Sequence, residues 1–164
     1  MRILGIDPGL AILGWGIIDS DRTGQKLVEY GCIYTSPDEC FPDRLKHIAV
    51  DMRALLAAFR PDQIVYEELF FARNVTTALN VAAARGVSLS VCAEYTRELY
   101  EYTPMQIKQA ITGWGRAEKP QIQQMVKLLL KMDHIPKPDD AADAIAIALT
   151  HAAAGPAGAQ FRMK

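Results

Sequence analysis

The stretch Arg2–Gly9 reads RILGIDPG, an apolar run that ends on a carboxylate and a Pro-Gly turn. An apolar run of this length, bounded by a turn, predicts a fully buried β-strand over residues 2–7. A charged group at the end of a buried strand costs several kcal/mol unless a compensating group lies beside it. The Asp7 carboxylate therefore needs a partner, and further carboxylates at similar positions would indicate a shared cation.

The residues after this strand predict a mixed α/β arrangement. Residues 13–19 and 26–35 have strand patterns, and the short turns make these strands antiparallel neighbours. Apolar residues at helical spacing predict a helix over 42–59, and a crossover through it favours a parallel strand at 63–67. The remaining expected elements are a helix over 75–95, a strand over 99–102, a helix from Pro104 to about Ile111, a helix over 120–132 and a helix over 139–153.

Together these elements predict one α/β domain over residues 1–155, followed by a flexible tail over 156–164. Its five-stranded mixed sheet has three antiparallel strands followed by two parallel strands, with helices on its flanks. With 164 residues, half of them hydrophobic, the chain can bury a substantial core. No apolar run approaches the ~18 residues of a membrane span, and residue 2 onward does not resemble a signal peptide, so we expect a cytoplasmic protein with no membrane contact.

The distribution of charge is more informative than its sum. The net charge is −1, but residues 104–131 carry five basic residues against Glu118 alone. A basic segment on a mildly acidic body can hold phosphates, although most charge runs are only solvated helix faces. The cysteines Cys32, Cys40 and Cys92 have no metal-type spacing and are expected to be reduced thiols.

Three further carboxylates occupy positions comparable to that of Asp7. Glu67 ends the strand 63–67, and a parallel pairing with the first strand places it beside Asp7 at ~5 Å strand spacing. Asp140 and Asp143 lie three residues apart on one face of a helix that is apolar all round, so this helix is buried against the sheet. Helix capping explains one acidic residue at its start but neither Asp143 nor Asp7.

Clustered carboxylates indicate a divalent cation. Without a counter-charge they repel one another, and some stay protonated at neutral pH. Oxygen ligands without a cysteine or histidine set favour Mg²⁺, or Mn²⁺ as a substitute, over zinc. Two such ions ~4 Å apart activate a water and stabilise a leaving phosphate oxygen, so the chemistry expected is hydrolysis of a nucleic-acid backbone.

Several motifs resemble the RuvC family of Holliday junction resolvases over about residues 1–153. They are the opening strand with Gly14-Trp15-Gly16, the stretch Glu67–Asn74 (EELFFARN), Ala84-Arg85-Gly86, residues 106–109 with Gly113, Gly115, Glu118 and Lys119, and Asp140–Ala144 (DAADA). The resemblance implies a ribonuclease H-like fold and a homodimer that nicks four-way DNA junctions in pairs with Mg²⁺, during recombination and repair. It also implies cooperation with the branch-migration proteins RuvA and RuvB.

The resemblance also assigns residues to roles. Asp7, Glu67, Asp140 and Asp143 would be the catalytic metal ligands, Lys108 and Lys119 would lie near the scissile phosphate, and Phe70 would contact the junction. From the residues alone, Phe70 either packs under its loop or stacks on unpaired bases, where stacking is worth ~1–3 kcal/mol per base. Arg73 either meets a phosphate or is solvated. The histidines His47, His134 and His151 are expected at the surface or at helix ends.

Three other functions compete with the junction resolvase. A related ribonuclease H-like nuclease acting on structured or precursor RNA shares the opening strand. Actin-like sugar kinases and ATPases also begin with such a strand, but they need two domains and a longer chain. A non-catalytic junction-binding scaffold has no use for four mutually repelling carboxylates.

Overall fold

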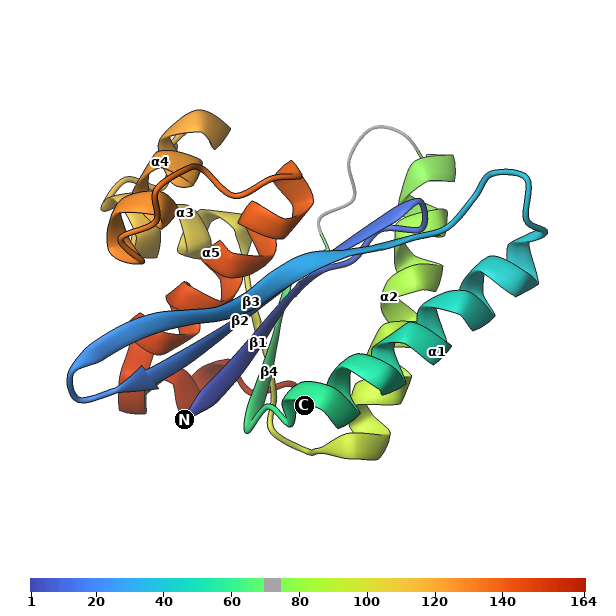
Figure 1. Ribbon diagram of the computed structural model, residues 1–164, viewed down its shortest axis with the longest axis horizontal. Helices are drawn as coiled ribbons and strands as arrows, with labels where there is room; N and C mark the ends of the chain where they lie inside the picture. The colour runs from blue at the N-terminus through green and yellow to red at the C-terminus, as the bar shows by residue number, and fades with distance from the viewer. Residues whose placement is uncertain (70–74) are drawn as a thin grey trace.

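A computed structural model describes residues 1–69 and 75–164, which form a five-stranded mixed sheet between two groups of helices (Figure 1). β1 to β3 pair antiparallel, and β4 pairs parallel with both β1 and β5. The predicted sheet, three antiparallel strands followed by two parallel strands, is therefore confirmed. In spatial order the strands are β3 (Gly24–Tyr34), β2 (Ile12–Asp21), β1 (Arg2–Asp7), β4 (Gln63–Glu67) and β5 (Leu99–Tyr102).

Helices cover both faces of the sheet (Figure 1). One face carries α1 (Phe41–Phe59) and α2 (Val75–Tyr95), and the other carries α3 (Pro104–Thr112), α4 (Lys119–Leu129) and α5 (Asp139–Ala154). A short 3₁₀ helix, η1 (Gly155–Phe161), follows α5. Within the described residues no helix has the length and apolar character needed to cross a membrane.

Alternation of side chains along β1 divides the core into two parts. Leu4 and Ile6 belong to the cluster under α1 and α2, whereas Ile3 belongs to the cluster under α5. All three are fully buried, and burying such a side chain contributes roughly 1.5–3 kcal/mol. Because both faces are covered, a shift of one residue would exchange the two sets, so the packing fixes the register of the strand.

Glycines bring α5 onto the sheet. Gly5 pairs with Gly16, and Asp7 pairs with Gly14, so these glycines share the α5 face of β1 and β2. A Cβ atom on Gly5 would collide with the Ala144 carbonyl, and one on Gly14 would collide with the Asp140 carbonyl. The backbone of α5 therefore rests directly on the two strands. This contact places the first turn of α5 beside the end of β1.

The helix predicted over 120–132 begins and ends earlier than expected. Glu118 and Gln121 form a capping box that starts α4 at Lys119. The helix ends at Leu129, because Lys131 adopts a left-handed backbone conformation with φ 52°. The turn at 130–132 follows from this change of conformation, which apolar periodicity does not detect.

The C-terminal segment, predicted as a flexible tail, is docked on the sheet. The Phe161 ring lies 4.5 Å from the Tyr102 ring between centroids, and Arg162 Nη2 donates to Glu98 Oε1 at 2.6 Å. The Met163 backbone N–H donates to the Leu99 carbonyl at 2.9 Å. An aromatic contact, an ion pair and a backbone hydrogen bond thus hold a segment whose small residues gave no helical or strand pattern.

Candidate active site

Asp7 and Glu67 lie at the carboxyl ends of neighbouring parallel strands. The register pairs Gly5 with Val65 and Ile6 with Tyr66, and its next step places Glu67 beside Asp7. Val65 packs in the α5 cluster, so Glu67, two residues later, faces the same side. Glu68 follows the strand and is exposed.

Asp140 and Asp143 reach this edge from the first two turns of α5. Gly14 lets the Asp140 backbone approach β2 directly, opposite Asp7 in the register. The apolar positions that follow Asp143 are buried from Ala144 to Leu149, so the helix cannot turn its acidic end toward open solvent. The four carboxylates predicted to act together are thus brought to one end of the sheet.

The carboxylates influence one another strongly. Burial, followed by the charges of Asp143, Glu67 and Asp140, raises the pKa of Asp7 to about 7, and Lys119 opposes this rise. Burial and the charge of Asp143 also raise the pKa of Glu67, against the effect of Lys108 and Lys119. Near neutral pH the cluster therefore lacks enough positive charge to keep all of its members ionised.

Two lysines supply part of the missing charge. Lys119 Nζ lies 2.8 Å from Asp143 Oδ2 and 3.8 Å from Asp139 Oδ2. Lys119 is fixed in place by the capping box that begins α4, and Lys108 is on α3, whose start is capped by Thr103. A cavity of about 190 Å³ is lined by Glu67, Asp143 and both lysines, together with apolar residues of α3, α4 and α5.

A second cavity lies on the other side of Glu67. It has a volume of about 300 Å³ and is lined by Asp7, Pro8, Glu67, Glu68, Leu69, Val81 and Pro104. Glu67 and Pro104 line both cavities, so the acidic cluster lies between two hollows. An extended chain with regularly spaced phosphates could pass over such a site without entering a closed pocket.

The donor set fits a hard divalent cation by its chemistry. It consists of carboxylate oxygens, whose repulsion a cation would relieve. Among the described residues, no three His, Cys, Asp or Glu side chains converge to the geometry of a metal site. Electrostatic coupling extends over several ångströms, whereas ligation requires oxygens at ~2.0–2.6 Å. The carboxylates are therefore close enough to influence one another electrostatically, but their oxygens are not yet at ligation distances from a common point.

Other predicted residues have different outcomes. Phe70 and Arg73 lie outside the described residues. His151 lies in the last turn of α5, at a helix end as predicted, but it is only 4% exposed. His151 Nε2 and Gln63 Oε1 are 2.9 Å apart, and the Tyr102 hydroxyl lies 2.8 Å from Nδ1. This network is buried between α5, β4 and β5, and no ligand spacing in the sequence indicates it.

The contact between α5 and the strand glycines was not recognised from the sequence, although it positions the acidic cluster. Gly14 and Gly16 flank Trp15 in a strand, where glycine normally weakens the pairing and marks close approach of another backbone. Cys32 pairs with Gly14 in the next strand and lies close enough to Asp140 that the carboxylate raises its pKa, after burial, to about 11. The GxG spacing was the available indication.

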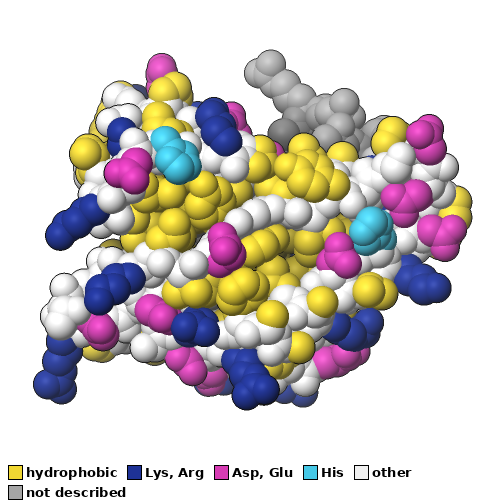
Figure 2. Space-filling model, viewed as in Figure 1, with side chains coloured by type: hydrophobic (Ala, Val, Ile, Leu, Met, Phe, Trp, Pro, Cys, Tyr) yellow, Lys and Arg dark blue, Asp and Glu magenta, His cyan; other side chains and the backbone are white. Residues whose placement is uncertain are grey.

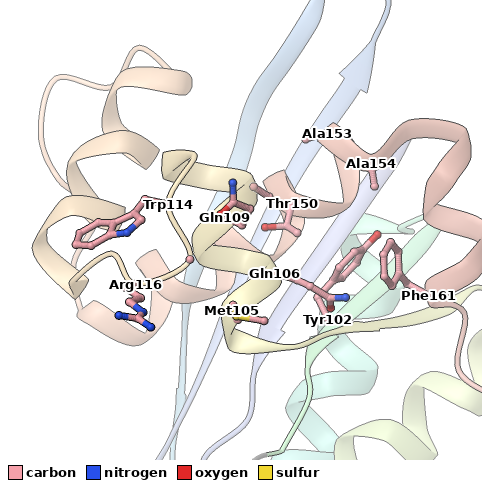
Figure 3. Close-up of a pocket in the computed structure, with 12 residues that line it drawn as sticks. Tyr102, Met105, Gln106, Gln109, Trp114, Arg116, Thr150, Ala153, Ala154 and Phe161 are labelled. Carbon is pink, nitrogen blue, oxygen red and sulfur yellow. The ribbon is translucent and has the colours of Figure 1, made fainter.

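A large groove lies away from the carboxylates. It has a volume of about 660 Å³ and runs between α3, the end of α5 and Phe161 (Figure 3). Two of its polar side chains are bonded internally: Gln109 donates to the Gly113 carbonyl, and Thr150 donates to the Ala146 carbonyl. This apolar groove lacks the carboxylates that metal-assisted phosphodiester chemistry needs, so size alone does not locate the site.

A second apolar hollow lies between α4 and the β2–β3 hairpin. Figure 2 shows hydrophobic side chains within it and charges of both signs scattered around it. The hairpin residues 23–27 and residues 129–132 line a cavity of about 460 Å³ at this place. This hollow also lacks acidic lining residues, so it offers no second centre for hydrolysis.

Comparison with known proteins identifies the family. The family model described as "Crossover junction endodeoxyribonuclease RuvC" matches residues 3–151. A protein of that name from Finegoldia magna is 54% identical over 151 residues, which cover 92% of each chain. Another from Alkaliphilus metalliredigens is 49% identical over 164 residues, the whole of both chains.

Solved structures agree with this assignment. Thermus thermophilus RuvC in complex with a Holliday junction substrate superposes with a TM-score of 0.90, at 37% identity over 96% of each chain. The yeast mitochondrial resolvase Ydc2 has a TM-score of 0.71 at 15% identity, over 98% of this chain and 82% of that one, which supports the fold alone. These names describe DNA enzymes, and the alternative of an RNA nuclease finds no support among them. The chain therefore belongs to the RuvC family of crossover junction endodeoxyribonucleases.

Proposed function

We propose that this nuclease resolves four-way DNA junctions by hydrolysis at the acidic cluster, with Mg²⁺ held by Asp7, Glu67, Asp140 and Asp143. The observation that carries the proposal is the burial of Asp7 among three further carboxylates, which raises its pKa to about 7. A fold does not maintain such repulsion for stability, because one neutral residue would relieve it. Mn²⁺ satisfies the same oxygen donors and is expected to substitute.

The four carboxylates contribute ligands and orientation. Bound Mg²⁺ would supply an activated water and stabilise the leaving oxygen of the phosphodiester. Asp7 and Glu67 are fixed by the parallel pairing of β1 and β4, and Asp143 is fixed by α5. Ligands on packed strands and a buried helix hold a reacting phosphate more precisely than loop residues do.

Lys108 and Lys119 are proposed to position the scissile phosphate. They line the same cavity as Glu67 and Asp143, so a phosphate above the cluster would lie within reach of both ammonium groups. Lys119 already compensates Asp143 at 2.8 Å. We infer that Lys119 exchanges part of this contact for a phosphate oxygen when the substrate and the cation arrive.

Recognition of the junction involves partners and residues outside this cluster. Phe70 is proposed, from the family resemblance, to stack on unpaired bases, and Arg73, which follows it, is proposed to contact a phosphate. Paired nicks require two acidic centres, and the described part of the chain provides one, which supports action as a homodimer. The outer sides of α1 and α2 leave Val50 and Leu79 exposed, as a helical dimer contact requires. RuvA and RuvB remain the expected functional partners.

The test combines one substitution with three substrates. A synthetic four-way junction, a linear duplex of the same sequence and a precursor RNA are incubated with Mg²⁺ or with EDTA. We expect cleavage of the junction alone, and only with Mg²⁺. Asp7→Asn should reduce cleavage by at least about 10³-fold, since it removes an anionic ligand, while junction binding in a gel persists.

Asp51→Asn is the matched control, because Asp51 is an aspartate on the surface of α1. It should cleave at the parent rate. Metal-dependent cleavage by Asp7→Asn at the parent rate would refute the proposed centre. Cleavage of RNA in preference to the junction would instead refute the proposed substrate and leave the centre standing.

A further inference from the structure

Tyr34 lies on the same face of the sheet as the acidic cluster, at the end of β3. The register leads from Asp7 to Gly14 on β2 and from Gly14 to Cys32 on β3. Tyr34 is two residues beyond Cys32, and Ile33 between them packs on the opposite face with the cluster under α1 and α2. From the spacing of strands and residues, the Tyr34 backbone lies roughly 12 Å from that of Asp7.

The ring of Tyr34 is exposed although its neighbours are buried. Its side chain is 54% exposed, whereas Ile33 and Thr35 are almost fully buried. The Thr35 hydroxyl donates to the Leu10 carbonyl and accepts from Arg44 Nε, which fixes the backbone at this point. A large aromatic residue is thus held rigidly with much of its surface in solvent, an arrangement more typical of a contact site than of a core.

The register connects Tyr34 to the Asp140 side of the acidic cluster. Cys32 lies on the same face of β3 and pairs with Gly14, whose backbone the Asp140 carbonyl approaches directly. After desolvation, the charge of Asp140 raises the pKa of the Cys32 thiol and that of the Tyr34 hydroxyl, in agreement with this placement. The exposed surface of Tyr34 is therefore near the end of the cluster that Asp140 occupies.

Tyr34 and the two lysines lie on opposite sides of the cluster. Lys108 and Lys119 come from α3 and α4 and lie beside Glu67 and Asp143. Tyr34 comes from β3, on the other side of β2 from the lysines. A DNA strand that crosses the carboxylates from the lysines toward β3 would meet the aromatic ring.

We propose that the Tyr34 ring stacks on a base of the cleaved strand next to the scissile phosphate and so positions that strand. Stacking on an aromatic ring stabilises a single-stranded base without regard to its identity. This inference rests on the proposed function of the acidic cluster. It adds a positioning residue on the side of the site that no lysine covers among the described residues.

The experiment measures stacking directly. Junctions carrying 2-aminopurine at successive positions on either side of the cleavage site are bound in EDTA, where no cleavage occurs. The parent protein should quench one position more than the others, and Tyr34→Ala should abolish that excess quenching. Removing one stacking contact should also raise the KM by about tenfold and change kcat by less than about threefold.

Tyr34→Phe and Tyr95→Ala are the controls. Tyr34→Phe keeps the ring and should retain both the quenching and the KM within about threefold. Tyr95 is a 42% exposed tyrosine at the end of α2, and its alanine variant should behave as the parent. Unchanged quenching and KM in Tyr34→Ala would overturn the inference while leaving the proposed centre intact, because Asp7→Asn tests that centre separately.

Discussion

At the scale of single residues, Asp7 makes the stability of the metal-free protein depend on pH. Its folded pKa of about 7 lies above the usual aspartate value of 3.8, so the folded state binds more protons than the unfolded state between these pH values. Stability therefore falls as pH rises from about 4 to about 7, and the loss is complete above the folded pKa. In urea denaturation with EDTA, we expect the free energy of unfolding of Asp7→Asn to exceed that of the parent by on the order of 2–4 kcal/mol at pH 8. The difference should be much smaller at pH 5.

Mg²⁺ provides the control for this pH dependence. A cation bound to the carboxylates favours their ionised forms, so saturating Mg²⁺ should stabilise the parent at pH 8 more than the Asp7→Asn variant. A stability difference between the two proteins that stays constant from pH 5 to pH 8 would contradict the raised pKa. An equal effect of Mg²⁺ on both would contradict the participation of Asp7 in cation binding.

At the scale of elements, the contact between β2 and α5 should be sensitive to a single methyl group. A Cβ atom at Gly14 would collide with the Asp140 carbonyl, and no flexible side chain is available there to move aside. We expect Gly14→Ala to lower the free energy of unfolding by about 1–3 kcal/mol, as overpacked core substitutions do. Displacement of Asp140 should also reduce the cleavage rate at least about tenfold. Urea denaturation and single-turnover cleavage measure the two effects.

Gly86 offers a matched glycine within α2. A Cβ atom there meets nothing within 4 Å, so Gly86→Ala should leave stability unchanged or raise it by up to about 1 kcal/mol, through helix propensity. If Gly14→Ala were as stable and as active as Gly86→Ala, the close packing of α5 on β2 would not be what positions Asp140.

The same elements show why the sequence predicts some features and not others. Apolar patterns and turn residues predict the strands and most helices, because a buried face requires apolar residues at regular spacing along the sequence. The four carboxylates were found because charge in apolar surroundings is rare. Periodicity does not show which strand glycine allows close contact with a helix backbone. It also does not show that the left-handed conformation of Lys131 ends α4. Nor does it show that His151 is buried between Gln63 and Tyr102, because that network joins three separate elements.

At the scale of the whole molecule, the acidic cluster and the docked C-terminus lie at opposite ends of the sheet (Figure 1). Asp7 and Glu67 end β1 and β4, whereas Arg162 pairs with Tyr100 and Glu98 near the start of β5. Deleting residues 156–164 removes the Phe161 contact with Tyr102, and losing this half-buried aromatic costs about 2 kcal/mol. We expect the melting temperature to fall by about 4–8 °C, while the kcat of the folded protein at 25 °C stays within about twofold. Scanning calorimetry and junction cleavage measure both, with removal of Lys164 alone as the control, which should change neither. An unchanged melting temperature would support the flexible tail that the sequence predicts. A large loss of kcat in the folded protein would show that the two ends of the sheet are coupled.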